Sequence, residues 1–186
     1  QRQMCIRDRS ERLIATVYRE DKVWRQSYRI GVPDGPVEII GDTDRHGTEI
    51  TFWPDREMFE TVEFDYTTLQ NRFRNQAFLN KEATINFEDK RTGRKERFHY
   101  DGGVSEFVEY LNRSKTPIHQ TPIHFTGERN GVMIDIAMQW TDGYTENFLA
   151  YTNNIPQKDG GTHVNGLRSA MTAVIKRCLL YTSPSP

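Results

Sequence analysis

The sequence has few cysteines, no long apolar run and almost no net charge. Its 186 residues include only 2 cysteines, Cys5 and Cys178, which lie near opposite ends of the chain. Two such residues exclude a disulfide framework and a cysteine-rich zinc site. Apolar runs extend for only a few residues, whereas a helix that spans a bilayer needs about 20. The net charge of −1 provides no general field for a nucleic acid or a membrane surface. We therefore expect a soluble intracellular protein that contacts DNA or RNA, if at all, through a few local cations.

The two ends of the chain differ from the interior. Residues 1–10 (QRQMCIRDRS) and residues 178–186 (CLLYTSPSP) carry no hydrophobic period and no helix cap that would join them to their neighbours. The first ten residues also lack the apolar core of a signal peptide. We expect both ends to be non-native additions, which would leave the two cysteines without functional meaning.

Hydrophobic periodicity in the first hundred residues indicates an α+β fold. Apolar residues alternate with period two over 12–21 and 22–33, which predicts a hairpin with Glu20, Asp21 and Lys22 between its strands. A further strand ends at Pro54, which lacks the donor needed to continue a ladder. The remaining expected elements are an amphipathic helix over 65–80 with Leu69, Phe73 and Ala77 on one face, a hairpin over 83–103 with its tip at Thr92-Gly93, and a short helix over 105–115 with Ser105 as N-cap.

Beyond Pro117 the pattern predicts a second part of the fold. Three strand-like runs within residues 122–154 are joined by Asn130-Gly131 and Asp142-Gly143, pairs that favour tight hairpin turns, so we expect an antiparallel meander. A helix capped by Thr162 follows. Its expected packed stripe comprises Val164, Leu167, Met171, Val174 and Ile175. We place the boundary between the two parts near residues 103–117.

Several local patterns are compatible with chemistry but favour a structural interpretation. Gly160-Gly161 precedes a helix N-terminus, a position that can bind anions, and Gln157 and Lys158 stand beside it. No Lys-Ser or Lys-Thr pair follows as in a P-loop, so a simple turn is the better prediction. The 5 histidines are scattered without metal-ligand spacing, and the basic run over 89–97 includes acidic residues at a hairpin tip.

Thr48 and Arg19 have ordinary interpretations when only the residues are considered. Thr48 shares a strand face with Ile50 and Phe52, which we expect to face the core, so its hydroxyl would need a partner if buried. A threonine is also a common strand residue, and Arg19 at a strand end is most often solvated. No serine, cysteine or carboxylate pair indicates a nucleophile or an acid–base couple. The residues alone therefore predict a structural scaffold that could line one side of a ligand site, and they do not predict a reaction centre.

Four long phrases carry a resemblance to a known family. Residues 46–81 (HGTEITFWPDREMFETVEFDYTTLQNRFRNQAFLNK), 98–119 (FHYDGGVSEFVEYLNRSKTPIH), 138–156 (MQWTDGYTENFLAYTNNIP) and 159–172 (DGGTHVNGLRSAMT) closely resemble the gyrase B proteins of bacterial DNA gyrase, a type II topoisomerase. The resemblance covers nearly all of residues 11–177. It implies the second half of a GHKL-type ATPase sandwich followed by the start of a β-α-β transducer domain.

The resemblance implies a domain layout for this chain. Residues 11–103 would be the C-terminal half of the ATPase domain, and residues 104–118 a linking helix. Residues 119–177 would then form the N-terminal part of the transducer.

The resemblance also implies roles for individual residues. Thr48 matches a strand threonine that helps to hold adenine, and Ile50 matches the adjacent pocket wall. Arg19 matches an arginine at the pocket rim that coumarin inhibitors engage. Arg168 matches a helix arginine that faces the cavity for DNA. No catalytic residue and no metal ligand is expected here, because the family's general base, magnesium ligand, adenine-binding aspartate and ATP lid would precede residue 10.

The same resemblance implies cofactors and partners for the complete protein. These are ATP and Mg²⁺, DNA, the gyrase A protein, and a second copy of gyrase B in an A2B2 enzyme that is cytoplasmic and makes no membrane contact. Three alternatives remain at this point. The first is the corresponding ATPase protein of topoisomerase IV, although the phrase YTNNIPQKDGGTH favours gyrase. The second is a GHKL-related chaperone or mismatch-repair protein, and the third is a non-enzymatic interaction module.

Overall fold

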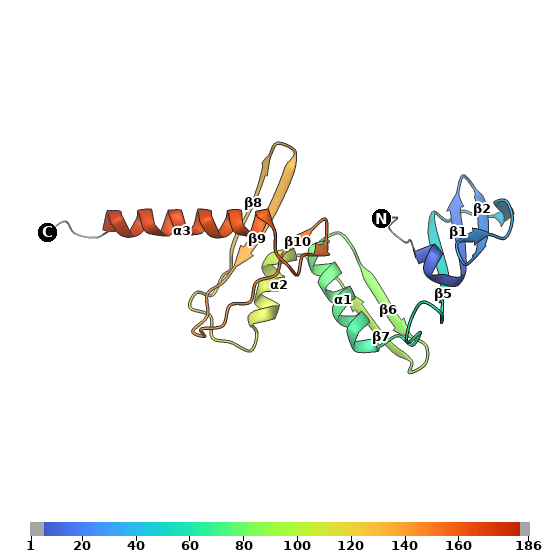
Figure 1. Cartoon of the computed structure of the whole chain (residues 1–186), viewed down its shortest axis with the longest axis horizontal. Coiled ribbons are helices and arrows are strands. Elements are labelled where there is room, and N and C mark those ends of the chain that lie inside the picture. Colours follow the sequence, from blue (N-terminus) through green and yellow to red (C-terminus); the bar gives the residue numbers. More distant parts are fainter. Residues whose placement is uncertain (1–5, 183–186) are drawn as a thin grey trace. The chain divides into compact units, whose positions relative to one another are not determined.

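The computed structural model describes residues 6–182, and the chain divides into two compact units, Gln1–Asp65 and Tyr66–Pro186. Among the described residues, the first unit consists mainly of β-strands, and the second combines three helices with short antiparallel sheets (Figure 1). This mixed architecture confirms the predicted fold class. None of the described helices is both long and apolar enough to cross a membrane.

The first unit is a five-stranded antiparallel sheet. Its strands run in the order β3-β2-β1-β5, and β4 also pairs with β2. A short 3-10 helix, Ile6–Arg9, precedes the sheet. The strand bounds are β1 Ser10–Arg19, β2 Lys22–Arg29, β3 Val32–Pro33, β4 Glu38–Asp42 and β5 Gly47–Pro54.

The predicted first hairpin is confirmed, with a tighter turn than expected. Arg19 pairs with Lys22, so Lys22 belongs to β2 and only Glu20 and Asp21 form the loop. Both loop residues have positive φ, 56° and 58°. This is the geometry of a type I′ turn, whose twist matches that of the flanking strands.

The second unit begins with a helix and a hairpin that share an aromatic core. Helix α1 (Tyr66–Leu79) lies alongside the hairpin of β6 (Ile85–Asp89) and β7 (Arg94–Phe98), as Figure 1 shows. Phe78 is 1% exposed and stacks on Tyr100 and Phe107, with ring centroids 3.7 Å and 4.8 Å away. The predicted helix and hairpin are thus confirmed. The predicted apolar stripe of α1 includes Ala77, which is buried, but it does not include Phe78, the neighbouring residue that forms the core.

Helix α2 (Gly103–Asn112) begins earlier than predicted, and Ser105 does not cap it. The backbone N–H of Gly102 instead donates to the Glu106 carboxylate, at 3.1 Å. Gly103 has a φ of +59°, which glycine adopts without steric cost and serine does not. The N-cap prediction for Ser105 was therefore wrong, because a carboxylate from the first turn reaches back to the residues before the helix.

The predicted meander is only partly formed. Strands β8 (Ile123–Arg129) and β9 (Val132–Met138) make the expected hairpin about Asn130-Gly131. The turn expected at Asp142-Gly143 was wrong, because the Asp142 N–H donates to the Thr116 carbonyl at 3.0 Å and no strand follows over residues 142–150. Backbone pairing with the segment before β8 has replaced the third strand.

The C-terminal segment contains a short hairpin and a long helix. Strands β10 (Tyr151–Thr152) and β11 (Ile155–Pro156) lead to α3 (Thr162–Thr182). Along the expected stripe, Val164 is buried, whereas Val174 and Ile175 are 52% and 50% exposed. The stripe is therefore packed in the first half of the helix only. The proposal that residues 178–186 are non-native stays a prediction, and α3 continues through the first of them.

A ring of amide hydrogen bonds joins the β10–β11 turn to the end of α1. The Asn154 side chain donates to the Asn80 side chain at 2.8 Å, and the Asn154 carbonyl accepts from Gln76 at 3.1 Å. Asn80 in turn donates to the Gln76 carbonyl at 2.7 Å. Asn154 is more than 70 residues away from both partners in sequence, so the ring anchors the segment that leads into α3.

Replacing Asn154 by glycine should therefore destabilise the second unit. Asn153 and Asn154 both have positive φ, 47° and 64°, so each accepts glycine in the same backbone geometry. Only Asn154→Gly removes the bond to Asn80, which we expect to cost about 0.5–1.5 kcal/mol more than Asn153→Gly. Urea unfolding of the two variants measures this difference, and equal free energies of unfolding would contradict the anchoring role.

Candidate functional site

One face of the first sheet brings together the three residues predicted to line a nucleotide pocket. Thr48 on β5 lies opposite Val17 on β1, and Ile50 lies opposite Ala15. Residues directly opposite each other in an antiparallel pair share a face, as do residues two apart on one strand. Arg19 follows Val17 by two positions and therefore belongs to this face. The fold thus places Arg19, Thr48 and Ile50 on a common surface.

This face is more open than the sequence pattern indicated. Leu13 is 4% exposed, but Ile50 is 48% exposed and Thr48 is also exposed. Phe52 is half-buried and meets Phe64 edge-on, with ring centroids 6.0 Å apart. The expectation that Ile50 faces a core was wrong in this unit. A surface with an apolar wall and an accessible hydroxyl can contact a ligand directly.

Arg19 stands at the end of β1 with its guanidinium already paired. Its Nε lies 3.0 Å from the Glu20 carboxylate, and both side chains are 67% exposed. The indole N–H of Trp24 donates to the Arg19 carbonyl at 3.3 Å, which fixes the backbone at the strand end. An ion pair this exposed contributes little energy, so the guanidinium can exchange Glu20 for a ligand.

Backbone hydrogen bonds fold the Gly160-Gly161 segment into a turn that leads into α3. The Gly160 N–H donates to the Gln157 carbonyl at 3.3 Å, and the Gln157 N–H donates to the Ala150 carbonyl at 2.8 Å. The Gly161 carbonyl accepts from Val164 and Asn165 in the first turn of α3. Hydrogen bonds of this kind support the predicted structural turn, because they give these residues a role in leading the chain into α3.

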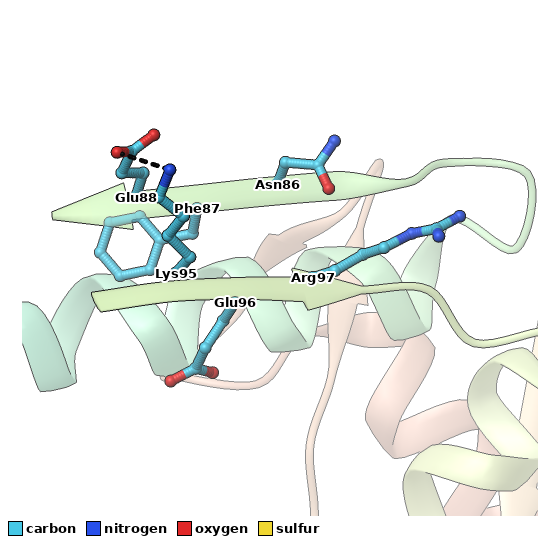
Figure 2. Close-up of a pocket in the computed structure, with 6 residues that line it drawn as sticks. All are labelled: Asn86, Phe87, Glu88, Lys95, Glu96 and Arg97. Carbon is cyan, nitrogen blue, oxygen red and sulfur yellow. Dashed lines mark ion pairs between the residues drawn. The ribbon is translucent and has the colours of Figure 1, made fainter. Parts of the chain in front are cut away.

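The basic hairpin tip is neutralised by neighbouring carboxylates. Arg91 contacts both oxygens of Asp89, at 3.0 Å and 2.9 Å, and this hydrogen bonding lowers the pKa of the Asp89 carboxyl. Figure 2 shows the ion pair of Glu88 and Lys95 beside an open pocket, with Glu96 on the opposite side of the strands. Paired charges of this kind are typical of a solvated hairpin.

Glu96 has a structural role beneath this hairpin. Its carboxylate accepts hydrogen bonds from the Tyr66 hydroxyl, at 2.7 Å, and from Gln70. The bond to Glu96 raises the pKa of the Tyr66 hydroxyl, because ionisation would place two negative charges side by side. Glu96 thus ties β7 to α1, and it is not available as a catalytic base.

The three predicted residues would account for only part of a nucleotide site. Thr48 and Ile50 form an accessible surface with one hydroxyl, and Arg19 adds one exposed cation. Across residues 6–182, no group of three or more histidine, cysteine and acidic side chains is arranged to hold a metal ion. The roles of these three residues toward a base and a rim group stay predictions.

Arg168 on α3 is held by a carboxylate and an aromatic ring. Its Nη2 lies 2.9 Å and 3.0 Å from the two oxygens of Glu146, and its guanidinium carbon lies 5.0 Å from the centre of the Phe148 ring. The sequence analysis missed both partners. They are about 20 residues away on an irregular segment, where no periodicity indicates a contact.

Comparisons with known proteins match most of the length of the chain. The family model described as DNA gyrase B matches residues 103–181. The gyrase B protein of Myxococcus xanthus is 46% identical over 171 residues, which is 92% of this chain and 21% of that protein. The gyrase B protein of Bacillus mycoides is 44% identical over 168 residues, which is 89% of this chain and 42% of that protein. The chain therefore spans about a fifth to two fifths of the length of these relatives.

Solved structures match the fold. The 43K ATPase domain of Thermus thermophilus gyrase B, in complex with an aminocoumarin, superposes with a TM-score of 0.80 at 30% identity. The match covers 97% of this chain and 51% of that one. The gyrase B structure from Myxococcus xanthus gives a TM-score of 0.82 at 23% identity, over 91% of this chain and 50% of that one, and supports the fold alone.

Proposed function

The chain belongs to the DNA gyrase B family, and from this premise we propose that the protein of which it is a part couples ATP hydrolysis to DNA strand passage and negative supercoiling. The observation that carries the proposal is the match to a gyrase B ATPase domain over 97% of the chain. The alternative within the same enzyme class is the ATPase protein of topoisomerase IV. The relatives described above, all named as gyrase, favour the first.

The proposed cofactors are ATP and Mg²⁺, and this chain supplies a limited part of their site. Thr48 would join the network around the adenine, Ile50 would form the adjacent wall, and Arg19 would stand at the rim. When bound, Mg²⁺ neutralises charge on the transferring phosphate. The likeness to an ATPase domain bound to an aminocoumarin supports this assignment.

The proposed partners are DNA, the gyrase A protein and a second copy of gyrase B in a cytoplasmic A2B2 enzyme. In this arrangement Arg168 would face the DNA. We also propose that residues 11–103 complete the ATPase domain, residues 104–118 link it, and residues 119–177 begin the transducer. The family match starting at residue 103 supports the boundary between residues 103 and 104, although the compact units divide between Asp65 and Tyr66.

The complete protein tests the proposal directly. Combined with gyrase A, it should introduce negative supercoils into relaxed circular DNA only when ATP and Mg²⁺ are present. Decatenation without supercoiling would instead support the topoisomerase IV alternative. Absence of any ATP-dependent change in topology would contradict the proposed function.

The 186 residues expressed alone should neither hydrolyse ATP nor bind it tightly. Across residues 6–182 no group of three or more histidine, cysteine and acidic side chains is arranged to hold a metal ion, so we expect no bound Mg²⁺ to stabilise charge on the transferring phosphate. Calorimetry with a non-hydrolysable ATP analogue measures binding, and circular dichroism checks that the chain is folded. Micromolar affinity in a folded sample would overturn this expectation.

Thr48→Val in the complete protein should lower the affinity for ATP and leave the fold intact. Loss of one hydroxyl from a hydrogen-bond network that the ligand covers costs about 1–3 kcal/mol, because its partners stay desolvated. Equilibrium binding of the same ATP analogue measures the effect, and the melting temperature serves as the control. Unchanged affinity for the ATP analogue would contradict a binding role for Thr48 and support its interpretation as an ordinary strand residue.

Arg19→Gln in the complete protein should weaken aminocoumarin binding more than ATP binding. A rim cation contacts ligands that extend beyond the nucleotide, and its pairing with Glu20 is exposed enough to exchange. The matched control is Arg29→Gln, another exposed strand-end arginine with an acidic neighbour, whose Nε lies 3.7 Å from Asp34. Equal losses for the two ligands, or the same result from both variants, would contradict the rim assignment.

A further inference from the structure

We propose that Glu146 competes with DNA phosphate for the Arg168 guanidinium, so that the carboxylate weakens the contact of Arg168 with DNA until it is displaced. The inference rests on the proposed function, in which Arg168 faces DNA. It assigns Glu146 the role of an intramolecular competitor, which occupies the Arg168 guanidinium in the absence of DNA phosphate. It also makes Phe148 a positioning residue that retains the guanidinium once the carboxylate has left.

The contact between Arg168 and Glu146 uses the group that phosphate would use. The guanidinium Nη2 lies 2.9 Å from Oε1 and 3.0 Å from Oε2 of the carboxylate. Arginine binds carboxylates and phosphates through the same planar array of N–H donors. The two anions therefore compete for the Nη2 group, and a phosphate that uses this nitrogen requires release of the carboxylate.

The ion pair is accessible and weak enough to be displaced. The Arg168 side chain is 51% exposed and that of Glu146 is 62% exposed, so solvent reaches both groups. Exposed pairs typically contribute less than about 1 kcal/mol. DNA phosphates present a dense array of negative charge, and release of their counterions favours the exchange.

The backbone around Glu146 permits the carboxylate to move. Residues 142–150 form no helix and no strand between the bridge at Thr141 and the start of β10. Release of Glu146 therefore breaks no ladder within this segment. Arg168, by contrast, lies within α3, where the Thr172 hydroxyl donates to its carbonyl at 2.8 Å.

Phe148 holds the guanidinium independently of the carboxylate. The guanidinium carbon lies 5.0 Å from the ring centre, within the range of a cation–π contact. This contact does not involve the Glu146 side chain, so we expect it to keep Arg168 oriented when the carboxylate leaves. An arginine side chain without that contact would have to be fixed in one rotamer when it binds phosphate, and the lost conformational entropy would weaken binding.

Binding of the complete protein to a duplex DNA oligonucleotide, followed by fluorescence anisotropy at fixed low salt, tests the proposal. Glu146→Gln removes the competing charge and should tighten binding about two- to fivefold, the range of an exposed ion pair. Asp142→Asn is the matched control, since it removes the same charge from the same irregular segment. A nonspecific charge effect would tighten both variants equally, and that result would overturn the proposal.

The double variant separates this inference from the proposed function. Arg168→Gln should weaken DNA binding, and adding Glu146→Gln to it should change nothing further, because the competition needs both groups. Wild-type affinity in Arg168→Gln would remove Arg168 from the DNA surface. Weakened binding in Arg168→Gln, together with wild-type binding in Glu146→Gln, would support the contact between Arg168 and DNA. It would contradict the proposal that Glu146 competes for Arg168.

Phe148→Leu tests the positioning role. It keeps the charge and much of the apolar volume, so a purely electrostatic account predicts no change. We expect weaker DNA binding in Phe148→Leu, and also in the Phe148→Leu/Glu146→Gln double variant relative to Glu146→Gln. Unchanged affinity in both would exclude a positioning role for the ring.

Discussion

The stacking of Phe78 is the contact on which the second unit depends. This side chain stands at the end of α1, is 1% exposed, and packs between Tyr100 after β7 and Phe107 on α2. It also approaches Tyr110, with ring centroids 5.4 Å apart. One ring thus joins α1, the segment after β7 and α2. Removal of a buried phenylalanine of this kind typically costs about 3–5 kcal/mol, a large share of the stability of a small unit.

Polar contacts then attach the C-terminal elements to this core. Asn154 reaches the end of α1, close to Phe78 in the chain, and Asn112 on α2 donates to Gln139 after β9 at 3.1 Å. The core sets the geometry of these amide pairs, because hydrogen bonds weaken steeply when distance and angle depart from their optimum. The position of α3, and of Arg168 upon it, therefore follows from packing around residues far earlier in the chain.

The two arginines proposed to meet ligands share one electrostatic arrangement. Arg19 pairs with Glu20, and Arg168 pairs with Glu146, each in an exposed ion pair. If both arginines bind anions as proposed, a bound anion would exchange with a carboxylate at each position. The net charge of −1 provides no general field for such ligands, so we expect these local exchanges to matter.

Local pattern alone determined much of the secondary structure and the family. The alternation through β1 and β2, the helix over α1 and the Asn130-Gly131 hairpin all follow from interactions between near neighbours, which sequence spacing records. The four family phrases likewise identified the gyrase B resemblance and, through it, Thr48, Ile50, Arg19 and Arg168. Tertiary structure decided the rest. The missing third strand after Asp142, the central role of Phe78 and the pairing of Glu146 with Arg168 all depend on partners that the chain brings together only when it folds. Contacts at such sequence separations leave no periodic signal, because their register is set by packing and not by spacing.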